Sequence, residues 1–325
     1  MKRFKFFATA GSAALILFGF VWVALLSRSQ PLPTAETPLL LYSNQSRDNL
    51  HALFAQAIRE AKSSLHISMY ALTDPELLAL LRQQAKKGVS TTLFYDPSAT
   101  SKPPDSENFY AFPIKLPGAL MHRKILIVDE ERVFIGSANF TTTSLKIHDN
   151  LVAGILNPQL AHFLTRCDRE IFPFFTGEAA GELWLLPSQE ALERTLELLN
   201  QAKKSIYVAM FTLTHPELTR ALIEAHARGV DVRVAVDHYT AEGASLPMLK
   251  ALQNAGVPLY LSAGQQLFHH KWALIDSSTL LLGSANWTQA AFARNQDCFL
   301  VLPALSQKQL SQIQKIWKII ELESQ

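Results

Sequence analysis

Cysteine and net charge are both scarce in this sequence of 325 residues. Cys167 and Cys298 are its two thiols, and no Cys-x-x-Cys spacing exists, so a zinc site built on thiolates is not expected. Two separate buried thiols are the ordinary interpretation, and a disulfide is the alternative in an exported protein. The 30 basic and 28 acidic residues leave a formal net charge of +2. That balance gives no general electrostatic footprint for nucleic acid, although it permits a local basic groove.

A long hydrophobic run stands at the N-terminus. Residues 6–26 carry no charge, three basic residues precede them, and Arg28 closes the run. Its 21 residues fit a membrane span, which needs about 17–25, better than a signal-peptide core of about 7–15. No small-x-small cleavage site follows. Residues 1–28 are therefore predicted to form one N-terminal transmembrane helix, with a long cleaved signal as the alternative.

The charges around this run predict the location of the protein. Basic residues before a span favour a cytoplasmic N-terminus, which puts the rest of the chain on the extracytoplasmic side. Cleavage of the run would make the protein secreted instead. Residues 29–38 are polar and contain three prolines, so they are predicted to link the membrane segment to the domain.

The rest of the sequence repeats itself, and such repetition sets the architecture. Residues 64–73 match residues 205–214, and the same offset relates Asp96 to Asp237. Helix-like and strand-like segments alternate in both copies, which predicts an α/β fold with βαβ units and a parallel or mixed sheet.

We place the first repeat at residues 39–177 and the second at residues 178–325. No long flexible linker separates them, so the two halves are expected to pack tightly on each other. Helices are expected at residues 49–62, 76–87 and 191–203, and strands at residues 65–72, 89–95 and 122–128.

The repeats diverge in one place. The first has a proline-bearing, aromatic loop at residues 97–117, whereas the second has a helix at 245–255 and a strand at 257–262. This difference lies on the approach to the site proposed below, where loops usually decide which substrate enters.

One motif occurs twice: His-x-Lys-x4-Asp-x6-Gly-Ser-Ala-Asn. The copies are His122, Lys124, Asp129, Gly136, Ser137, Ala138 and Asn139, and His269, Lys271, Asp276, Gly283, Ser284, Ala285 and Asn286. Residues two apart on a strand share a face, so each histidine projects with its lysine. The serines and asparagines that follow add neutral donors near the same point.

Two such sets facing each other suit the cleavage of a phosphodiester. That reaction needs a nucleophile, a proton for the leaving oxygen, and donors where negative charge builds up. Imidazole can fill the first two roles, because its pKa of about 6.5 lets either form act near neutrality. Lys124, Lys271, Ser137, Asn139, Ser284 and Asn286 would hold the phosphate oxygens. No metal or other cofactor is expected, since an ammonium group two residues from each histidine repels a cation.

The doubled motif resembles the signature of the phospholipase D superfamily, over about residues 39–320. The resemblance implies two phospholipase D-like α/β repeats related by a pseudo-twofold axis, with the site at their interface. It implies a phosphohistidine intermediate, with His122 as the nucleophile and His269 as the acid. It also implies an acidic residue after each motif that orients a histidine, and we assign that role to Asp149 and Asp297, where members more usually carry glutamate.

Several residues have plainer interpretations that must be weighed. Asp129 and Asp276 belong to the signature of the catalytic site, but an aspartate that opens a tight turn is commonly structural. His270 should point to the opposite strand face from His269. His148 and His238 have no counterpart in the other repeat, and Phe140 and Trp287 are expected in the core.

Three functions follow from these observations. The first is a membrane-anchored phosphodiesterase that hydrolyses phospholipid head groups, active as a monomer. A close variant is phosphatidyl transfer, as in cardiolipin synthesis. The second is an exported metal-independent nuclease, for which Arg82, Lys86, Lys87 and Lys102 are candidate basic residues. The third is a scaffold without activity, which two intact motifs make the least favoured.

Overall fold

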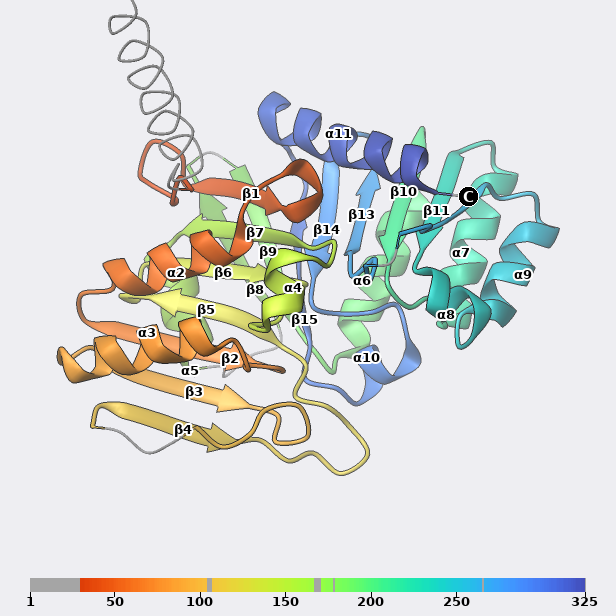
Figure 1. Cartoon of the computed structure of the whole chain (residues 1–325). Helices are drawn as coiled ribbons and strands as arrows, with labels where there is room; N and C mark the ends of the chain where they lie inside the picture. Colours follow the sequence, from red (N-terminus) through yellow and green to blue (C-terminus); the bar gives the residue numbers. More distant parts are fainter. Residues whose placement is uncertain (1–29, 104–106, 167–170, 178, 265, 325) are drawn as a thin grey trace, which may run out of the picture. The chain divides into compact units, whose positions relative to one another are not determined.

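The computed structural model describes residues 30–103, 107–166, 171–177, 179–264 and 266–324. From Leu32 onward these residues form one compact unit (Figure 1). The predicted transmembrane helix lies outside the described residues. Among the residues that are described, no helix is both long and apolar enough to cross a bilayer.

The first repeat forms a mixed sheet of seven strands. They are β1 (Leu39–Ser43), β2 (Ser64–Met69), β3 (Ser90–Tyr95), β4 (Phe109–Pro113), β5 (Lys124–Val128), β6 (Arg132–Gly136) and β7 (Leu151–Leu156). Their order is β1-β7-β6-β5-β2-β3-β4. Strands β2, β3 and β4 run parallel, and the remaining pairs are antiparallel. The expected mixed sheet is therefore confirmed.

The second repeat builds the same order of strands with one addition. Its strands are β8 (Ile171–Thr176), β9 (Ala179–Leu185), β10 (Ser205–Met210), β11 (Asp231–Val236), β12 (Leu259–Leu261), β13 (Lys271–Ile275), β14 (Thr279–Gly283) and β15 (Cys298–Leu302). The order is β12-β11-β10-β13-β14-β15-β9-β8. Read from β9, it repeats the first sheet strand for strand, which bears out the two-repeat architecture.

Helices flank both sheets, and two of them, α5 and α11, pack against the core that the sheets share (Figure 1). They are η1 (Asn44–Ser46), α2 (Leu50–Glu60), α3 (Pro75–Lys86), α4 (Thr142–Lys146), α5 (Pro158–Arg166), α6 (Gln189–Gln201), α7 (Pro216–Ala227), α8 (His238–Glu242), α9 (Leu246–Asn254), α10 (Gln289–Ala293) and α11 (Gln307–Glu323). Local chemistry fixes where they begin. The Asp74 carboxylate accepts a hydrogen bond from the Leu77 amide, and Pro75 supplies the first helical residue of α3.

A shared core joins the two repeats. Ile125 and Ile135 of the first sheet belong to the same buried cluster as Leu274 and Leu282 of the second. Each repeat also has a core of its own beneath its helices. The expected tight packing of the halves is thus present, and β14 of the second sheet contacts β6 and β7 of the first.

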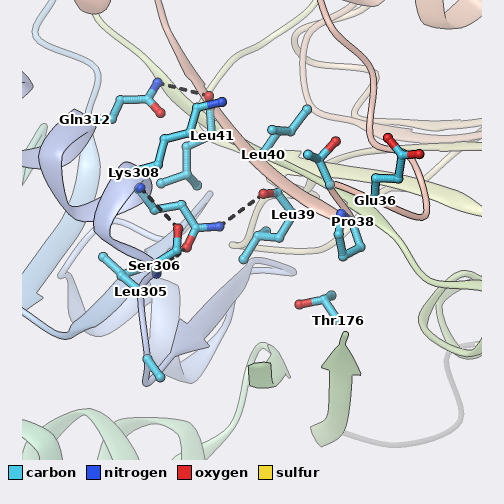
Figure 2. Close-up of a pocket in the computed structure, with 13 residues that line it drawn as sticks. Glu36, Pro38, Leu39, Leu40, Leu41, Thr176, Leu305, Ser306, Lys308 and Gln312 are labelled. Atoms are coloured by element: carbon cyan, nitrogen blue, oxygen red, sulfur yellow. Dashed lines mark hydrogen bonds between the residues drawn. The ribbon is translucent and has the colours of Figure 1, made fainter. Parts of the chain in front are cut away.

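Helix α11 closes the edge of the first sheet, although it follows the last strand of the second. The side-chain amide of Gln309 donates to the Leu39 carbonyl (3.1 Å), and that of Gln312 donates to the Leu41 carbonyl (3.0 Å). These bonds occupy carbonyls on the open side of the edge strand β1. Between helix and strand lies a pocket of about 390 Å³ with Lys308 at its rim (Figure 2). No residue of the repeated motif lines it.

Three expectations about segments need correction. The linker at residues 29–38 is partly built into the domain, because Leu32 is buried in the core of the first repeat. The loop at residues 97–117 contains strand β4, which pairs with β3 over five residues. Strand β8 lies within the residues that we assigned to the first repeat, but it forms a hairpin with β9 and so extends the second sheet.

The aromatic cluster around Trp317 on α11 generates a first prediction. Its ring lies within 6 Å of the rings of Tyr207, Tyr260 and Trp272. We expect Trp317→Ala to lower the free energy of unfolding by about 3–5 kcal/mol, because it leaves a cavity between helix and sheet. Urea unfolding followed by circular dichroism measures this. Leu322→Ala, at a position 76 % exposed on the same helix, should change it by less than about 0.5 kcal/mol; equal effects would contradict the packing role.

Candidate active site

Backbone hydrogen bonds between the repeats bring the two motif histidines to one place. The Gln296 amide donates to the Leu120 carbonyl, and at the matching position the Asp149 amide donates to the Leu267 carbonyl. His122 and His269 each follow two residues after these carbonyls and are both buried. Besides burial, charges from the opposite half-site act on both imidazoles: Lys271 lowers the pKa of His122, and Lys124 and His122 lower that of His269. The motif residues of the two repeats therefore lie close together, and a shared catalytic site stays a prediction.

Each histidine is held by a side chain from the opposite repeat. The Nδ1–H of His122 donates to Oδ1 of Asp297 at 2.8 Å. The Nδ1 of His269 lies 3.1 Å from Oδ1 of Asn150, which can accept a hydrogen bond from its N–H. In both cases Nε2 is left available for chemistry. Neither repeat could orient its own histidine alone.

Asn150, not Asp149, takes the place that we assigned to an orienting acid in the first repeat. His122 and Asn150 are separated by 28 positions, and so are His269 and Asp297. Counting this spacing would have found Asn150 in the sequence. Asp149 instead faces Gln266 and Glu323, and burial, with a smaller contribution from Glu323, raises its pKa to about 7. The two half-sites therefore differ, with a carboxylate behind one imidazole and a neutral amide behind the other.

The motif serines support these orienting residues and do not face the presumed phosphate. The hydroxyl of Ser137 donates to Oδ1 of Asn150 at 2.8 Å, and that of Ser284 donates to Oδ1 of Asp297 at 2.7 Å. Each hydroxyl also accepts the backbone amide of a neighbouring strand. Both serines are almost fully buried. Their assignment as phosphate ligands is corrected to one of positioning.

The two motif lysines are buried beside the histidines. Lys124 Nζ donates to the carbonyl of His122 at 2.7 Å, and Lys271 Nζ donates to that of His269 at 3.0 Å. Burial lowers the pKa of Lys124 to about 7. Burial, and then the charge of Lys124, lowers the pKa of Lys271 well below its usual range. Two ammonium groups buried together leave a site that an anion would stabilise.

An aromatic ring that our sequence interpretation missed stands in each half-site. Tyr70 lies 5.0 Å from the His122 ring, and Lys124 Nζ lies 5.2 Å from the centroid of the same Tyr70 ring. Phe211 holds the matching place beside His269 and Lys271, at 5.1 and 4.9 Å. Both follow the matched strands directly, so the offset between repeats was the signal that could have found them. The first half-site thus has a phenol where the second has a phenyl ring, and this is a second difference between them.

Burial controls the protonation of both imidazoles. Burial and then the charge of Lys124 lower the pKa of His122, while Asp297 opposes the shift. Burial and then the charge of Lys271 lower the pKa of His269 well below its usual range, and no carboxylate is bonded to it. The charge of His148, whose ring is 6.2 Å from that of His269, lowers the pKa of His269 as well. His269 is therefore the harder of the two to protonate.

Asn139 and Asn286, the remaining predicted phosphate ligands, are half-buried just beyond β6 and β14. Their Oδ1 atoms are buried without a hydrogen-bond partner in the described part of the chain. Each asparagine comes two positions after the serine that bonds to Asn150 or Asp297. This position is compatible with contact to an oxygen of a bound phosphate, and the assignment stays a prediction.

Asp129 and Asp276 lie at the far ends of β5 and β13, away from the histidines. The Asp129 carboxylate accepts the backbone amides of Lys62, Ser63 and Ser64 at 2.7–3.1 Å. Asp276 accepts three amides in the matching loop, from Lys203 to Ser205. Burial alone would raise the pKa of each carboxyl, but these amide bonds hold it below its usual value. Their inclusion among catalytic residues is corrected in favour of the turn role.

The other predicted positions fall as follows. Phe140 and Trp287 are buried in the core, as expected. His270 is also buried, with Nε2 2.9 Å from Oε1 of Gln45. Cys298 is a buried free thiol whose pKa burial raises to about 11, whereas Cys167 lies outside the described residues. Within the described ranges, no three histidine, cysteine or acidic side chains are grouped as a metal ion would require.

Comparison with known proteins now identifies the class. A family described as "Cardiolipin synthase, PLD-like domain" matches residues 54–167 and 195–318, which is more than half of the chain. The chain belongs to the phospholipase D superfamily.

Two relatives show how the likeness is distributed. The chain is 36 % identical over 115 residues to a mitochondrial cardiolipin hydrolase of Xenopus tropicalis, a match that covers 35 % of this chain and 54 % of that protein. It is 24 % identical over 300 residues to a cardiolipin synthase of Listeria welshimeri, covering 76 % and 62 %. The chain thus spans little more than half the length of the curated relatives it matches.

Solved structures share the fold at low identity. Phosphatidylserine synthase of Haemophilus influenzae superposes with a TM-score of 0.69 at 14 % identity, covering 91 % of this chain and 88 % of that one. Polyphosphate kinase of Porphyromonas gingivalis gives 0.61 at 15 %, covering 88 % and 50 %. At these identities the likeness establishes the two-repeat architecture alone.

The contacts of Asp129 predict a stability effect without a catalytic one. We expect Asp129→Ala to lower the free energy of unfolding by about 1–3 kcal/mol, because three loop amides lose their acceptor. Activity per folded molecule should stay within about twofold. Chemical unfolding and active-fraction assays measure the two effects, with the exposed Glu131→Ala as control. Loss of activity at unchanged stability would restore a chemical role.

The buried lysines predict that anion binding weakens with rising pH. A depressed pKa means that Lys124 is charged below pH 7 and loses its charge above it. Sulfate keeps its charge over this range, so its affinity should fall about tenfold between pH 6 and pH 8. Isothermal titration calorimetry at several pH values measures this. Lys124→Gln should flatten the dependence, and a wild-type affinity that does not change with pH would contradict the assignment.

Proposed function

We propose that this protein is a phosphodiesterase that hydrolyses phospholipid head groups through a phosphohistidine. The observation that carries the proposal is the crossed pair of contacts, His122 to Asp297 and His269 to Asn150, with both motif lysines buried beside them. The names of the relatives, a cardiolipin hydrolase and a cardiolipin synthase, support a phospholipid as the substrate.

The first step transfers the phosphatidyl group to the protein. Nε2 of His122 attacks phosphorus while its Nδ1–H stays bonded to Asp297. A nitrogen–phosphorus bond forms, and the bond from phosphorus to the head-group oxygen breaks. Nε2–H of His269 gives that oxygen a proton, so the head group leaves as an alcohol.

The second step releases the phosphatidyl group. His269, now neutral, takes a proton from water as the water oxygen attacks phosphorus. The nitrogen–phosphorus bond breaks, its electron pair returns to His122, and phosphatidic acid is the product. His269 regains the proton that it gave away, so the cycle closes without a further reactant.

The difference between the half-sites supports this division of roles. A phosphorylated imidazole is cationic, and the carboxylate of Asp297 stabilises that charge on His122. Asn150 offers His269 only a neutral acceptor, so a protonated His269 is the stronger acid. A bound phosphodiester supplies the negative charge that makes protonation of His269 favourable. Lys124 and Lys271 hold the oxygens on which charge accumulates.

Phosphatidyl transfer is the second candidate, and a specific observation favours it. The relative named cardiolipin synthase matches over 76 % of this chain, more than the hydrolases do. An alcohol that replaces water in the second step would give transfer with the same residues. Arg82 and Lys86 give the nuclease alternative no support, because both lie on α3, which ends where the chain turns back toward β3, at the sheet end away from the site.

A substrate panel tests the proposal. The purified protein is incubated with phosphatidylcholine, phosphatidylglycerol, cardiolipin or single-stranded DNA, with a chelator and with or without glycerol. Release of head group with phosphatidic acid supports hydrolysis, and a new phosphatidyl ester in glycerol supports transfer. Cleavage of DNA alone would overturn the lipid assignment. Complete loss of activity with the chelator would contradict chemistry carried by the histidines and lysines.

The assigned roles predict where phosphate is trapped. With a phosphatidyl ester of p-nitrophenol, whose leaving group needs no proton, His269→Ala should accumulate acid-labile, base-stable phosphate on His122. The second step should slow by about 10²–10⁴-fold, because its general base is missing. His122→Ala should form no adduct. Quenching followed by mass spectrometry locates the phosphate, and an adduct on His269 in His122→Ala would reverse the two roles.

A further inference from the structure

One face of the first sheet carries exposed aromatic side chains on β3 and β4. Leu93 and Tyr95 of β3 point into the core beneath the helices, so Phe94 points to the other face. Phe94, Tyr110 and Phe112 are 37 %, 52 % and 47 % exposed. The rings of Phe94 and Phe112 stack at 5.5 Å. These three side chains cover neighbouring positions, because Phe94 pairs with Phe112 across the two strands.

The same face of the second sheet is covered. There Ala235 pairs with Tyr260 at the positions that match Phe94 and Phe112. Ala235 is buried in the shared core, and the Tyr260 ring lies 5.8 Å from that of Trp317 on α11. In Figure 1, α11 starts on the side of β1 and passes across β14 and β13 toward β10, whereas β4 forms the border of the first sheet farthest from β1. The face of β3 and β4 that carries the aromatic side chains is thus exposed in the first repeat, whereas the matching face of the second repeat is covered.

The chain connects this face to the active site. The chain passes from β4 through residues 114–120 to His122. Asp96, two residues after Phe94, accepts the Met121 amide through Oδ2 at 3.0 Å. Leu120 is 36 % exposed at the end of this segment, where its amide donates to Asn295. We call Phe94, Tyr110, Phe112 and Leu120 the interfacial patch.

Charge at the site end of the interfacial patch is positive. Lys115 is exposed between Phe112 and Leu120, and Arg294 is exposed beside the Asn295 that holds Leu120. Glu107 is exposed at the other end of β4. Anionic head groups would therefore be attracted to the end of the patch nearest His122, where the phosphodiester must enter.

We infer that the interfacial patch binds the surface of a bilayer containing anionic phospholipid, so that a lipid enters the site from the side of His122. The inference rests on the proposed function for its substrate. Aromatic rings with positive charge beside them suit a membrane interface, where apolar faces meet acyl chains and the Tyr110 hydroxyl meets water. The three exposed rings offer roughly 300 Å². A stable contact with a second copy needs about 800 Å² from each partner.

Fluorescence quenching tests the contact without using activity. The full-length protein carrying Phe112→Trp is reconstituted into phosphatidylcholine vesicles with or without brominated phosphatidylglycerol. The added tryptophan should be quenched by the brominated lipid. The control is Phe175→Trp, at a position 68 % exposed on β8, which should not be quenched. Equal quenching at both positions, or none at position 112, overturns the inference.

Kinetics test the consequence for catalysis. The triple variant Phe94→Ser, Tyr110→Ser, Phe112→Ser should lose on the order of tenfold in activity on phosphatidylglycerol vesicles. Its activity on monomeric dihexanoyl phosphatidylglycerol should not change, which also shows that it folds. Equal loss on both substrates contradicts the inference.

If the wild type cleaves neither lipid, the proposed function fails, while the quenching result still decides the contact. If the tryptophan at position 112 is not quenched, two further results would reassign the patch. A triple variant with half the molecular mass of the wild type would assign it to self-association, and a triple variant that has lost RNA binding would assign it to nucleic acid.

Discussion

The exchange of side chains between the repeats is the contact on which the site depends. His122 is fixed by Asp297 and His269 by Asn150, so each imidazole is aligned by the half of the chain that does not carry it. The serines behind the orienting residues and the backbone bonds at Leu120 and Leu267 extend the same exchange. The apolar cluster between the sheets therefore sets catalytic geometry as well as stability. A shift of one sheet against the other would separate both histidines from their partners together.

Burial makes this arrangement unfavourable without a ligand. Two lysines and two histidines lie buried together, and Asp297 is the carboxylate that the described residues bring into a hydrogen bond with one of them, His122. Burial depresses the pKa values of all four bases. An anion entering this space restores charge to the lysines and allows protonation of His269. Binding and activation of the catalytic groups are thus parts of the same electrostatic event.

The repeated spacing was enough to predict two α/β repeats and the strands that carry the motifs. It did not predict the direction of a side chain where that direction depends on contacts between distant segments. Asp149 and Asn150 are neighbours, and the hydrogen bond to Leu267 turns one of them away from the site. Ser137 has the sequence context of a phosphate ligand, but its hydroxyl donates a hydrogen bond to Asn150 instead. Strand β4 was hidden among prolines because it is defined by pairing with β3, which no local pattern reveals.

The inequality of the half-sites has a consequence for how such a molecule can change. Were the motif encoded once and used twice in a symmetric dimer, any substitution behind one imidazole would occur behind the other as well. Here both copies lie in one chain, so Asp297 and Asn150, or Tyr70 and Phe211, can differ while the folds around them stay alike. Covalent fusion of the halves therefore permits a division of labour that identical subunits cannot reach.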